Sequence, residues 1–144
     1  MVQTLVQRYP ASAVHSLDLV QRHFATHSAW SFHSADLTDL AALSAVLQAT
    51  GATTVFHTAS PWTGSGEEVC EKVNVVGTRT VVDACVAVGV RKLVFTSSGG
   101  TVYSGEDLIN VDERMPFPIK PIDPYNVTKV SYCSYTPAGS ARAR

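Results

Sequence analysis

The chain has 144 residues, of which 45% are hydrophobic, and eleven Lys and Arg residues against twelve Asp and Glu residues give a net charge of −1. This length suits a single domain, and the composition is that of a globular protein rather than a disordered chain. The balanced charge lacks the basic surplus of nucleic-acid-binding proteins, and no apolar run of about eighteen residues is present to span a membrane.

Helical and extended signals alternate along the first part of the chain. Residues 1–9 predict the end of a helix, stopped by a proline. Residues 14–19 (VHSLDL) predict a strand, and residues 32–36 predict a weaker one. Thr38 is expected to cap a helix that Gly51 ends. The apolar stripe of this helix consists of Leu40, Leu43, Val46 and Leu47.

Two buried strands are predicted on either side of the longest helix. Residues 53–59 (TTVFHTA) are dense in β-branched side chains, and residues 92–97 (KLVFTS) form a similar run. Between them, residues 67–88 predict a helix that Gly89 ends. Its broad apolar face is expected to contain Val69, Val73, Val76, Val81, Ala84 and Val88.

The rest of the chain is rich in Gly and Pro until a final helix. Residues 99–124 predict a loop with at most one short strand, and a helix begins over residues 125–130. Strands that alternate with helices in this way indicate βαβ units. The expected fold is therefore α/β, with a doubly wound, Rossmann-like parallel sheet.

Tyr125 and Lys129 stand four residues apart in the last predicted helix, so they share one face. A phenol with a pKa of about 10 is a poor base at neutral pH, but a nearby ammonium group favours the phenolate. Such a tyrosine can move a proton to or from a hydroxyl group. The alternative is an ordinary surface pair, because this spacing often arises by chance.

Two serines provide a context for this tyrosine. Ser97 and Ser98 come where the strand of residues 92–97 runs out, and ligands of open α/β sheets bind at the carboxyl ends of strands. A serine there can hydrogen-bond a substrate oxygen while Tyr125 transfers the proton. The alternative is a turn used only for its backbone. With Tyr125 and Lys129 further along the chain, we favour the catalytic interpretation.

Residues at the ends of the other predicted strands suggest a nucleotide site. Asp18 ends the first strand, where an acid can accept hydrogen bonds from both ribose hydroxyls of NAD. Asp36 follows the second strand and could accept from an adenine amino group. Ala59 and Ser60 leave room for a cofactor, although each of these four residues could also be a solvated acid or part of a plain turn. Asp18 favours NAD, with NADP as the alternative, because an acid repels a 2′-phosphate.

The Gly-rich turn that binds phosphate in dinucleotide folds is missing. It normally precedes the ribose-binding acid by about 20 residues, and counting back from Asp18 leads to a point before Met1. The GxG at residues 64–66 follows a later strand and does not fit. We therefore expect a Rossmann-like sheet without its first strand. The strands at 14–19 and 53–59 would then either pair directly or leave two open edges.

Several strings across about residues 5–130 resemble the extended short-chain dehydrogenase/reductase superfamily and, within it, the 3β-hydroxysteroid dehydrogenase group. They are most similar to the fungal, decarboxylating sterol-4α-carboxylate 3-dehydrogenases. The strings are HSADLTD, VFHTASP, VNVVGTRTVVDAC, GVRKLVFTSSGGTVY, DLINVDERMPFP and DPYNVTK. The resemblance implies a partial NAD(P)-binding Rossmann-like domain over residues 1–132, truncated at both ends. Residues 133–144 are expected to form an irregular tail.

The resemblance also implies roles for individual residues. Tyr125 would be the general acid/base, and Lys129 its activator and a ribose contact. Ser98 would hold the substrate oxygen, with Ser97 as the alternative. Besides Tyr125 and Lys129, the residues expected to bind or line the cofactor, or to support its site, are Asp18, Asp36, Thr58, Ala59, Ser60 and Asn74.

The reaction that the resemblance implies is hydride transfer from the C-3 hydroxyl of a sterol or steroid to NAD(P)+, after which the 3-ketone eases loss of a C-4 carboxylate. The alternative is a non-catalytic fragment of such an enzyme that at most binds a partner. An intracellular protein is expected, cytoplasmic or peripheral at the endoplasmic reticulum, since no secretory signal is found and the three cysteines fit a reducing compartment. No metal site is expected, because His23, His27 and His33 lack acidic or cysteine partners.

Overall fold

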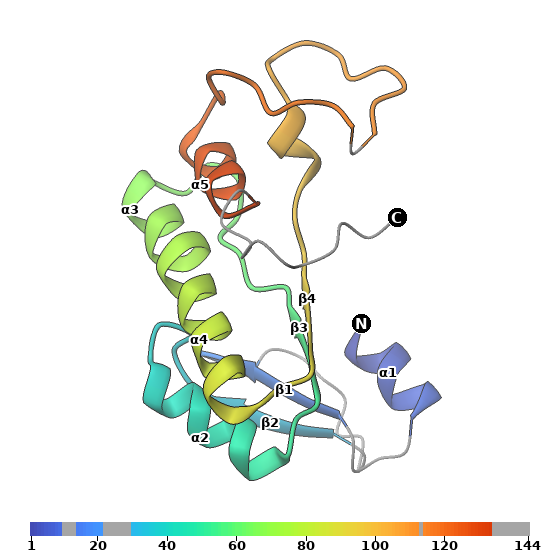
Figure 1. Cartoon of the computed structure of the whole chain (residues 1–144), viewed down its shortest axis with the longest axis vertical. Helices are drawn as coiled ribbons and strands as arrows, with labels where there is room; N and C mark the ends of the chain where they lie inside the picture. Colours follow the sequence, from blue (N-terminus) through green and yellow to red (C-terminus); the bar gives the residue numbers. More distant parts are fainter. Residues whose placement is uncertain (10–13, 22–29, 113, 134–144) are drawn as a thin grey trace.

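Strands and helices alternate along the chain, as predicted, and every strand pair among the described residues is parallel (Figure 1). The computed structural model describes residues 1–9, 14–21, 30–112 and 114–133. The strands are β1 (Val14–Asp18), β2 (Trp30–Ser34), β3 (Thr54–His57) and β4 (Lys92–Phe95). The helices are α1 (Val2–Arg8), α2 (Leu40–Thr50), α3 (Glu67–Cys70), the π-helix η2 (Glu71–Gly77), α4 (Thr78–Val88), the 3₁₀-helix η3 (Gly99–Val102) and α5 (Pro124–Cys133).

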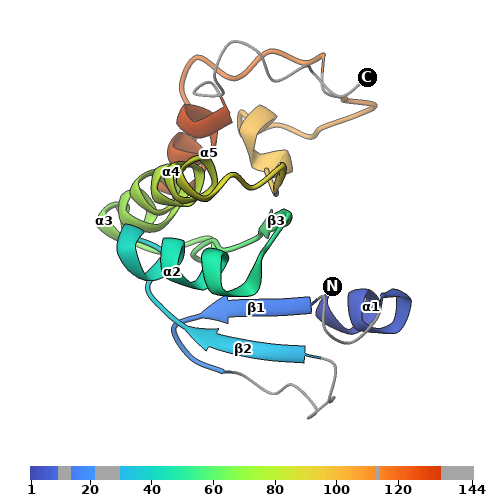
Figure 2. The ribbon, with the colours of Figure 1, turned by 60° about the horizontal axis from the view of Figure 1, so that its bottom comes forward.

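The four strands form two separate two-stranded sheets, β1–β2 and β3–β4. In Figure 2, β1 and β2 are seen along their length while β3 is seen nearly end-on, so the two pairs are not aligned. Of the two arrangements that the sequence allows, the structure therefore has the open one. β1 and β3 each have one edge without a strand partner among the described residues.

A single core between α2 and α4 supports both sheets. Its buried members are Leu43, Leu47, Val81, Ala84 and Cys85. Side chains from both sheets pack against it, among them Leu17, Val55 and Leu93. Because each sheet is anchored on these two helices, the gap between β1 and β3 does not separate the chain into two independent halves.

The strands β3 and β4 are less buried than the sequence predicts. Phe56 lies opposite Val94 in the β3–β4 register, and these two residues are 42% and 46% exposed. His57 is the one buried residue of β3. The prediction of two buried strands is therefore wrong, because α2 and α4 cover only one face of this sheet.

The helix predicted over residues 67–88 contains a π-helical segment, η2, between α3 and α4. A π-helix has more residues per turn than an α-helix, so it shifts the face that later residues present. Val69 and Val76, predicted to be buried, are 48% and 46% exposed, whereas Asn74 is buried. The predicted apolar face is confirmed only in α4, where Val81 is buried.

The start of α2 is capped by a different residue from the one predicted. The Asp39 carboxylate accepts a hydrogen bond from the Ala42 amide at 3.0 Å, which makes Asp39 the N-cap. The Thr38 hydroxyl instead donates to the Asp36 carboxylate at 2.8 Å. The predicted end is confirmed, since Gly51 adopts a left-handed conformation with φ of 61°.

Three predictions concern the segments after β4 and residues outside the described ranges. The Gly- and Pro-rich loop contains the 3₁₀-helix η3 and, among its described residues, no strand. α5 extends to Cys133, so the predicted start of the tail falls at the last residue of a helix. The remaining tail, residues 134–144, lies outside the described residues, as do His23 and His27.

Gly77, at the junction of η2 and α4, allows a close approach of Leu37. A Cβ atom on Gly77 would overlap Leu37 Cδ1 and lie 2.8 Å from its Cγ. We expect Gly77→Ala to lower the free energy of unfolding by about 1–3 kcal/mol, since overpacking outweighs the better helix propensity of Ala. Urea unfolding of Gly77→Ala, Leu37→Ala and the double variant checks this. The double variant should lose less than the sum of the two, and strict additivity would contradict the packing explanation.

Candidate functional site

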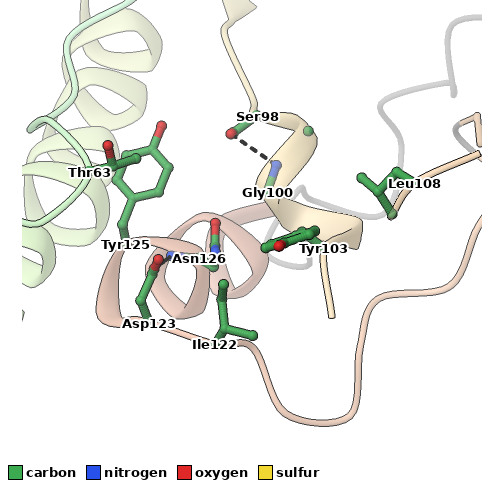
Figure 3. Close-up of a pocket in the computed structure, with 10 residues that line it drawn as sticks. Thr63, Ser98, Gly100, Tyr103, Leu108, Ile122, Asp123, Tyr125 and Asn126 are labelled. Atoms are coloured by element: carbon green, nitrogen blue, oxygen red, sulfur yellow. Dashed lines mark hydrogen bonds between the residues drawn. The ribbon is translucent and has the colours of Figure 1, made fainter. Parts of the chain in front are cut away.

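A pocket of about 340 Å³ lies where η3 faces the start of α5 (Figure 3). Its polar lining consists of Thr63, Ser98, Asp123, Tyr125 and Asn126, with the backbone of Gly99 and Gly100. Its other side chains are Tyr103, Leu108 and Ile122. Hydroxyl groups and apolar carbon therefore line the same cavity, which suits a mostly apolar ligand with a hydroxyl group.

Ser98 lines this pocket and Ser97 does not. Ser98 is the N-cap of η3, and its Oγ accepts a hydrogen bond from the Gly100 amide at 3.1 Å (Figure 3). The turn is held from the other side by Thr101, whose hydroxyl donates to the Ser98 carbonyl at 2.8 Å. With its oxygen accepting from the backbone, the Ser98 hydroxyl hydrogen can be donated to a ligand.

The start of α5 places Tyr125 in the pocket. Asp123 Oδ1 accepts from the Asn126 amide at 2.7 Å, which satisfies a free donor of the first helical turn. Tyr125 lies in this first turn, and Figure 3 shows its ring beside Thr63 with the hydroxyl pointing away from the helix. Tyr125 and Ser98 thus come from different elements to one cavity.

Lys129 lies one helical turn beyond Tyr125 and is only 2% exposed. Its Nζ is 5.7 Å from the centre of the Tyr125 ring and 5.1 Å from that of Phe95, and it donates to the Thr96 carbonyl at 3.4 Å. The two ion pairs found among the described residues both lie elsewhere in the chain. The positive charge of Lys129 is therefore held next to the Tyr125 ring by a backbone carbonyl and ring faces.

His57, a residue that the sequence analysis did not select, is buried beside Lys129. Its Nε2 is 2.8 Å from the Thr78 hydroxyl, and its ring lies 5.5 Å from that of Phe95. Burial, and to a smaller extent the charge of Lys129, lowers the pKa of His57 from 6.5 to about 4. Because a single histidine within a run of β-branched residues forms no distinctive sequence pattern, the buried environment of His57 could not be predicted from the sequence.

The depressed pKa of His57 predicts a pH-dependent stability. The unfolded chain takes up a proton near pH 6.5 and the folded chain only near pH 4. The free energy of unfolding should therefore be highest above pH 6.5, and fall by about 3 kcal/mol as the pH drops to 4. Urea unfolding across this range checks it, with His57→Gln expected to lose this part of the pH dependence. Identical pH profiles for the two proteins would contradict the assignment.

Asn74 connects the loop after β3 to α5 through both ends of its side-chain amide. The Ser60 hydroxyl donates to Asn74 Oδ1 at 3.1 Å, and Asn74 Nδ2 donates to the Thr128 hydroxyl at 3.0 Å. Thr128 in turn donates to the Tyr125 carbonyl at 2.9 Å. Asn74 is 2% exposed, so this chain of hydrogen bonds is buried and links the loop after β3 to the start of α5.

The other sequence-predicted cofactor residues lie outside the pocket. Asp18 is exposed at the carboxyl end of β1, and Thr58 and Ala59 are exposed beyond the end of β3. Asp36 follows β2, and its two carboxylate oxygens accept from Thr38 and, at 3.4 Å, from Lys72. These hydrogen bonds, chiefly that from the Thr38 amide, lower the pKa of Asp36. The pocket thus brings Ser98 and Tyr125 together, but not the residues expected at the adenosine half.

The pocket also contains residues that the sequence analysis missed. Thr63 and Asn126 add polar groups, while Tyr103, Leu108 and Ile122 form the apolar side. They lie in loops or next to Tyr125, where no periodicity marks them.

Among the described residues, no three His, Cys, Asp or Glu side chains gather in a way that could hold a metal ion. In the same part of the chain, no helix has the length and apolar character needed to cross a membrane.

The parallel α/β fold, the serine after β4 and the Tyr-x-x-x-Lys pair on α5 define part of a short-chain dehydrogenase/reductase. The sequence profile of the 3-beta hydroxysteroid dehydrogenase/isomerase family matches residues 1–132, and the chain belongs to this family.

Individual relatives agree with this family. The chain is 43% identical over 98 residues to a decarboxylating sterol-4-alpha-carboxylate 3-dehydrogenase of Saccharomyces cerevisiae, covering 68% of this chain and 28% of that enzyme. The enzyme of the same name from Mus musculus is 46% identical over 81 residues, covering 56% of this chain and 22% of the mouse protein. The chain thus spans less than a third of the length of these relatives.

Solved structures confirm the Rossmann-like fold. The NAD complex of UDP-glucose 4-epimerase from Thermus thermophilus superimposes with a TM-score of 0.77 at 26% identity, over 93% of this chain and 44% of that one. An epimerase from Methanothermobacter thermautotrophicus gives a TM-score of 0.72 at 27% identity, over 85% of this chain and 39% of that one. The expected α/β, Rossmann-like fold is therefore confirmed, and this chain spans less than half of the length of these neighbours.

Proposed function

We propose that this chain contains the catalytic site of an NAD-dependent dehydrogenase that oxidises the C-3 hydroxyl of a sterol 4α-carboxylate. The observation that carries the proposal is the pocket in which the Ser98 and Tyr125 hydroxyls meet an apolar side, with the Lys129 charge held beside the Tyr125 ring. The sterol-4-alpha-carboxylate 3-dehydrogenases among its relatives support the choice of substrate.

In the proposed reaction, Tyr125 removes the proton of the C-3 hydroxyl as the C-3 hydrogen leaves as hydride. Ser98 donates a hydrogen bond to the substrate oxygen and fixes it near the phenol. Lys129, whose Nζ lies 5.7 Å from the centre of the Tyr125 ring, would place its positive charge beside the residue that takes up this proton. NAD+, when bound, supplies the hydride acceptor. The 3-ketone product can hold an electron pair as its enolate, which eases the loss of the neighbouring carboxylate as CO₂.

The cofactor is proposed to contact two regions of the chain. Lys129 and the segment of Thr58, Ala59 and Ser60 would face the nicotinamide half, with Asn74 holding Ser60 in place. Asp18 and Asp36 would face the adenosine half. The exposed Asp18 carboxylate suits a ribose with two free hydroxyls, so we propose NAD, with NADP as the alternative. Asp36 would have to exchange hydrogen bonds to Thr38 or Lys72 for one to adenine.

We also propose that the protein acts inside the cell, in the cytoplasm or peripherally at the endoplasmic reticulum, as expected for an enzyme of a sterol substrate. The apolar side of the pocket, formed by Tyr103, Leu108 and Ile122, would receive the ring system.

The first test is a titration of the chain with NADH, followed by the fluorescence of the reduced nicotinamide. We expect saturable binding with a dissociation constant below about 1 mM. The second step is NAD+ reduction with a 4-carboxysterol, compared with the same sterol lacking the C-3 hydroxyl. Absence of both binding and turnover would overturn the proposal and favour the alternative of a non-catalytic chain.

A further inference from the structure

We propose that His57 is a positioning residue for Lys129, and that it acts as a neutral imidazole anchored on Thr78. This inference rests on the proposed function, because it assigns a partner to the lysine of that same site. Neither residue lines the pocket, so His57 is not expected to touch the substrate.

The first step of the argument is the environment of the Lys129 charge. Lys129 is 2% exposed, and the contacts found for its ammonium group are a backbone carbonyl, that of Thr96, and the faces of two aromatic rings. Dipoles and ring faces hold a buried charge less firmly than a carboxylate does, and a second positive charge nearby would displace it. A second positive charge among the neighbours of Lys129 is therefore disfavoured.

The second step is the place of His57 among the elements around Lys129. His57 ends β3, its Nε2 meets the Thr78 hydroxyl of α4 at 2.8 Å, and its ring packs on Phe95 of β4. Phe95 is also the ring whose centre lies 5.1 Å from the Lys129 ammonium group. The imidazole and the lysine of α5 thus contact the same aromatic ring.

The third step is the charge state of His57. Burial and the charge of Lys129 lower its pKa to about 4, so the imidazole is neutral at physiological pH. Lys129 is the charged group that acts on His57, while Thr78 and Phe95 present neutral groups to it. A neutral ring with a hydrogen-bonding nitrogen is what this position requires. A leucine would leave the Thr78 hydroxyl without this partner, and a lysine would add a second charge.

The test follows the ring protons of His57 by NMR as the pH is lowered, with the resonance assigned by its loss in His57→Gln. In the unchanged chain His57 should stay neutral above about pH 5. In Lys129→Met, the midpoint of its titration should move upward by about one pH unit, since the positive neighbour is gone. An unchanged midpoint would overturn the inference. This measurement needs no cofactor, so it is independent of the proposed function.

A second measurement asks whether positioning matters for the site. His57→Gln places an amide where it can still meet the Thr78 hydroxyl, and we expect NADH affinity within about threefold of the unchanged chain. His57→Leu cannot make this bond, and a loss of about tenfold or more is expected. Equal losses in the two variants would contradict the role of the hydrogen bond. If neither they nor the unchanged chain bind NADH, the proposed function fails while the NMR result still decides the link between His57 and Lys129.

Discussion

Replacement of Tyr125 by Phe is expected to lower the rate of NAD+ reduction with a 3β-hydroxysterol by a factor of about 10²–10⁴, the usual contribution of a general acid–base group. The phenol of Tyr125 shares the pocket with Ser98, and Lys129 lies beside its ring. Removing one oxygen leaves the ring and its packing in place. The free energy of unfolding and the NADH affinity should therefore change little.

The control for this variant is Tyr103→Phe, which removes the same atom from another tyrosine of the pocket. In Figure 3, Asn126 stands between Tyr103 and Tyr125, and the Tyr103 hydroxyl has no part in the proposed proton transfer. Rates should be compared over a range of pH, since loss of the acid–base group removes its ionisation from the profile. A rate of Tyr125→Phe equal to that of Tyr103→Phe would refute the role of Tyr125.

The second large effect is expected from Gly100→Ala, which should lower the free energy of unfolding by about 1–3 kcal/mol and disturb the pocket as well. A Cβ on Gly100 would overlap Asn126 Oδ1, and would lie 3.0 Å from Asn126 Cγ and 3.3 Å from Ser98 Oγ. Asn126 is 5% exposed and has little room to withdraw. The substitution thus pushes on two pocket residues at once.

The adjacent glycine provides a matched control. A Cβ on Gly99 would meet no atom within 4 Å, so Gly99→Ala should change the free energy of unfolding by less than about 0.5 kcal/mol. Thermal unfolding and the KM for the sterol should be measured for both variants. The steric overlap at Gly100 predicts that the two variants differ clearly in free energy of unfolding, although both replace glycine by alanine. Similar stability of Gly99→Ala and Gly100→Ala would contradict this prediction.

Local patterns in the sequence were sufficient to predict most elements of the fold. The β-branched runs of β3 and β4 and the glycine that ends α2 depend on nearby residues alone, and both features are present. Burial was predicted less well, because it depends on which face is covered. Phe56 and Val94 are apolar residues typical of buried strands. They nevertheless lie on the face of the β3–β4 sheet that α2 and α4 leave uncovered.

The candidate site was predictable where a short spacing carries the chemistry. Tyr125 and Lys129 are one turn apart, and the neighbouring strand end indicated Ser98. The π-helical turn could not be foreseen from a regular helical period, and with it the burial of Asn74 was missed. His57 was missed for another reason, since its role arises from contacts with elements distant in sequence.

The two separate strand pairs have a consequence for how the chain behaves while it folds. Parallel pairing must wait for a whole crossover segment, so β3 cannot meet β4 until α3, η2 and α4 have been accommodated between them. During that delay, the edges of β1 and β3 that have no strand partner among the described residues offer backbone donors and acceptors to strands of other molecules. Yield of folded protein should therefore fall steeply with chain concentration during refolding, and rise when chaperones keep the molecules apart.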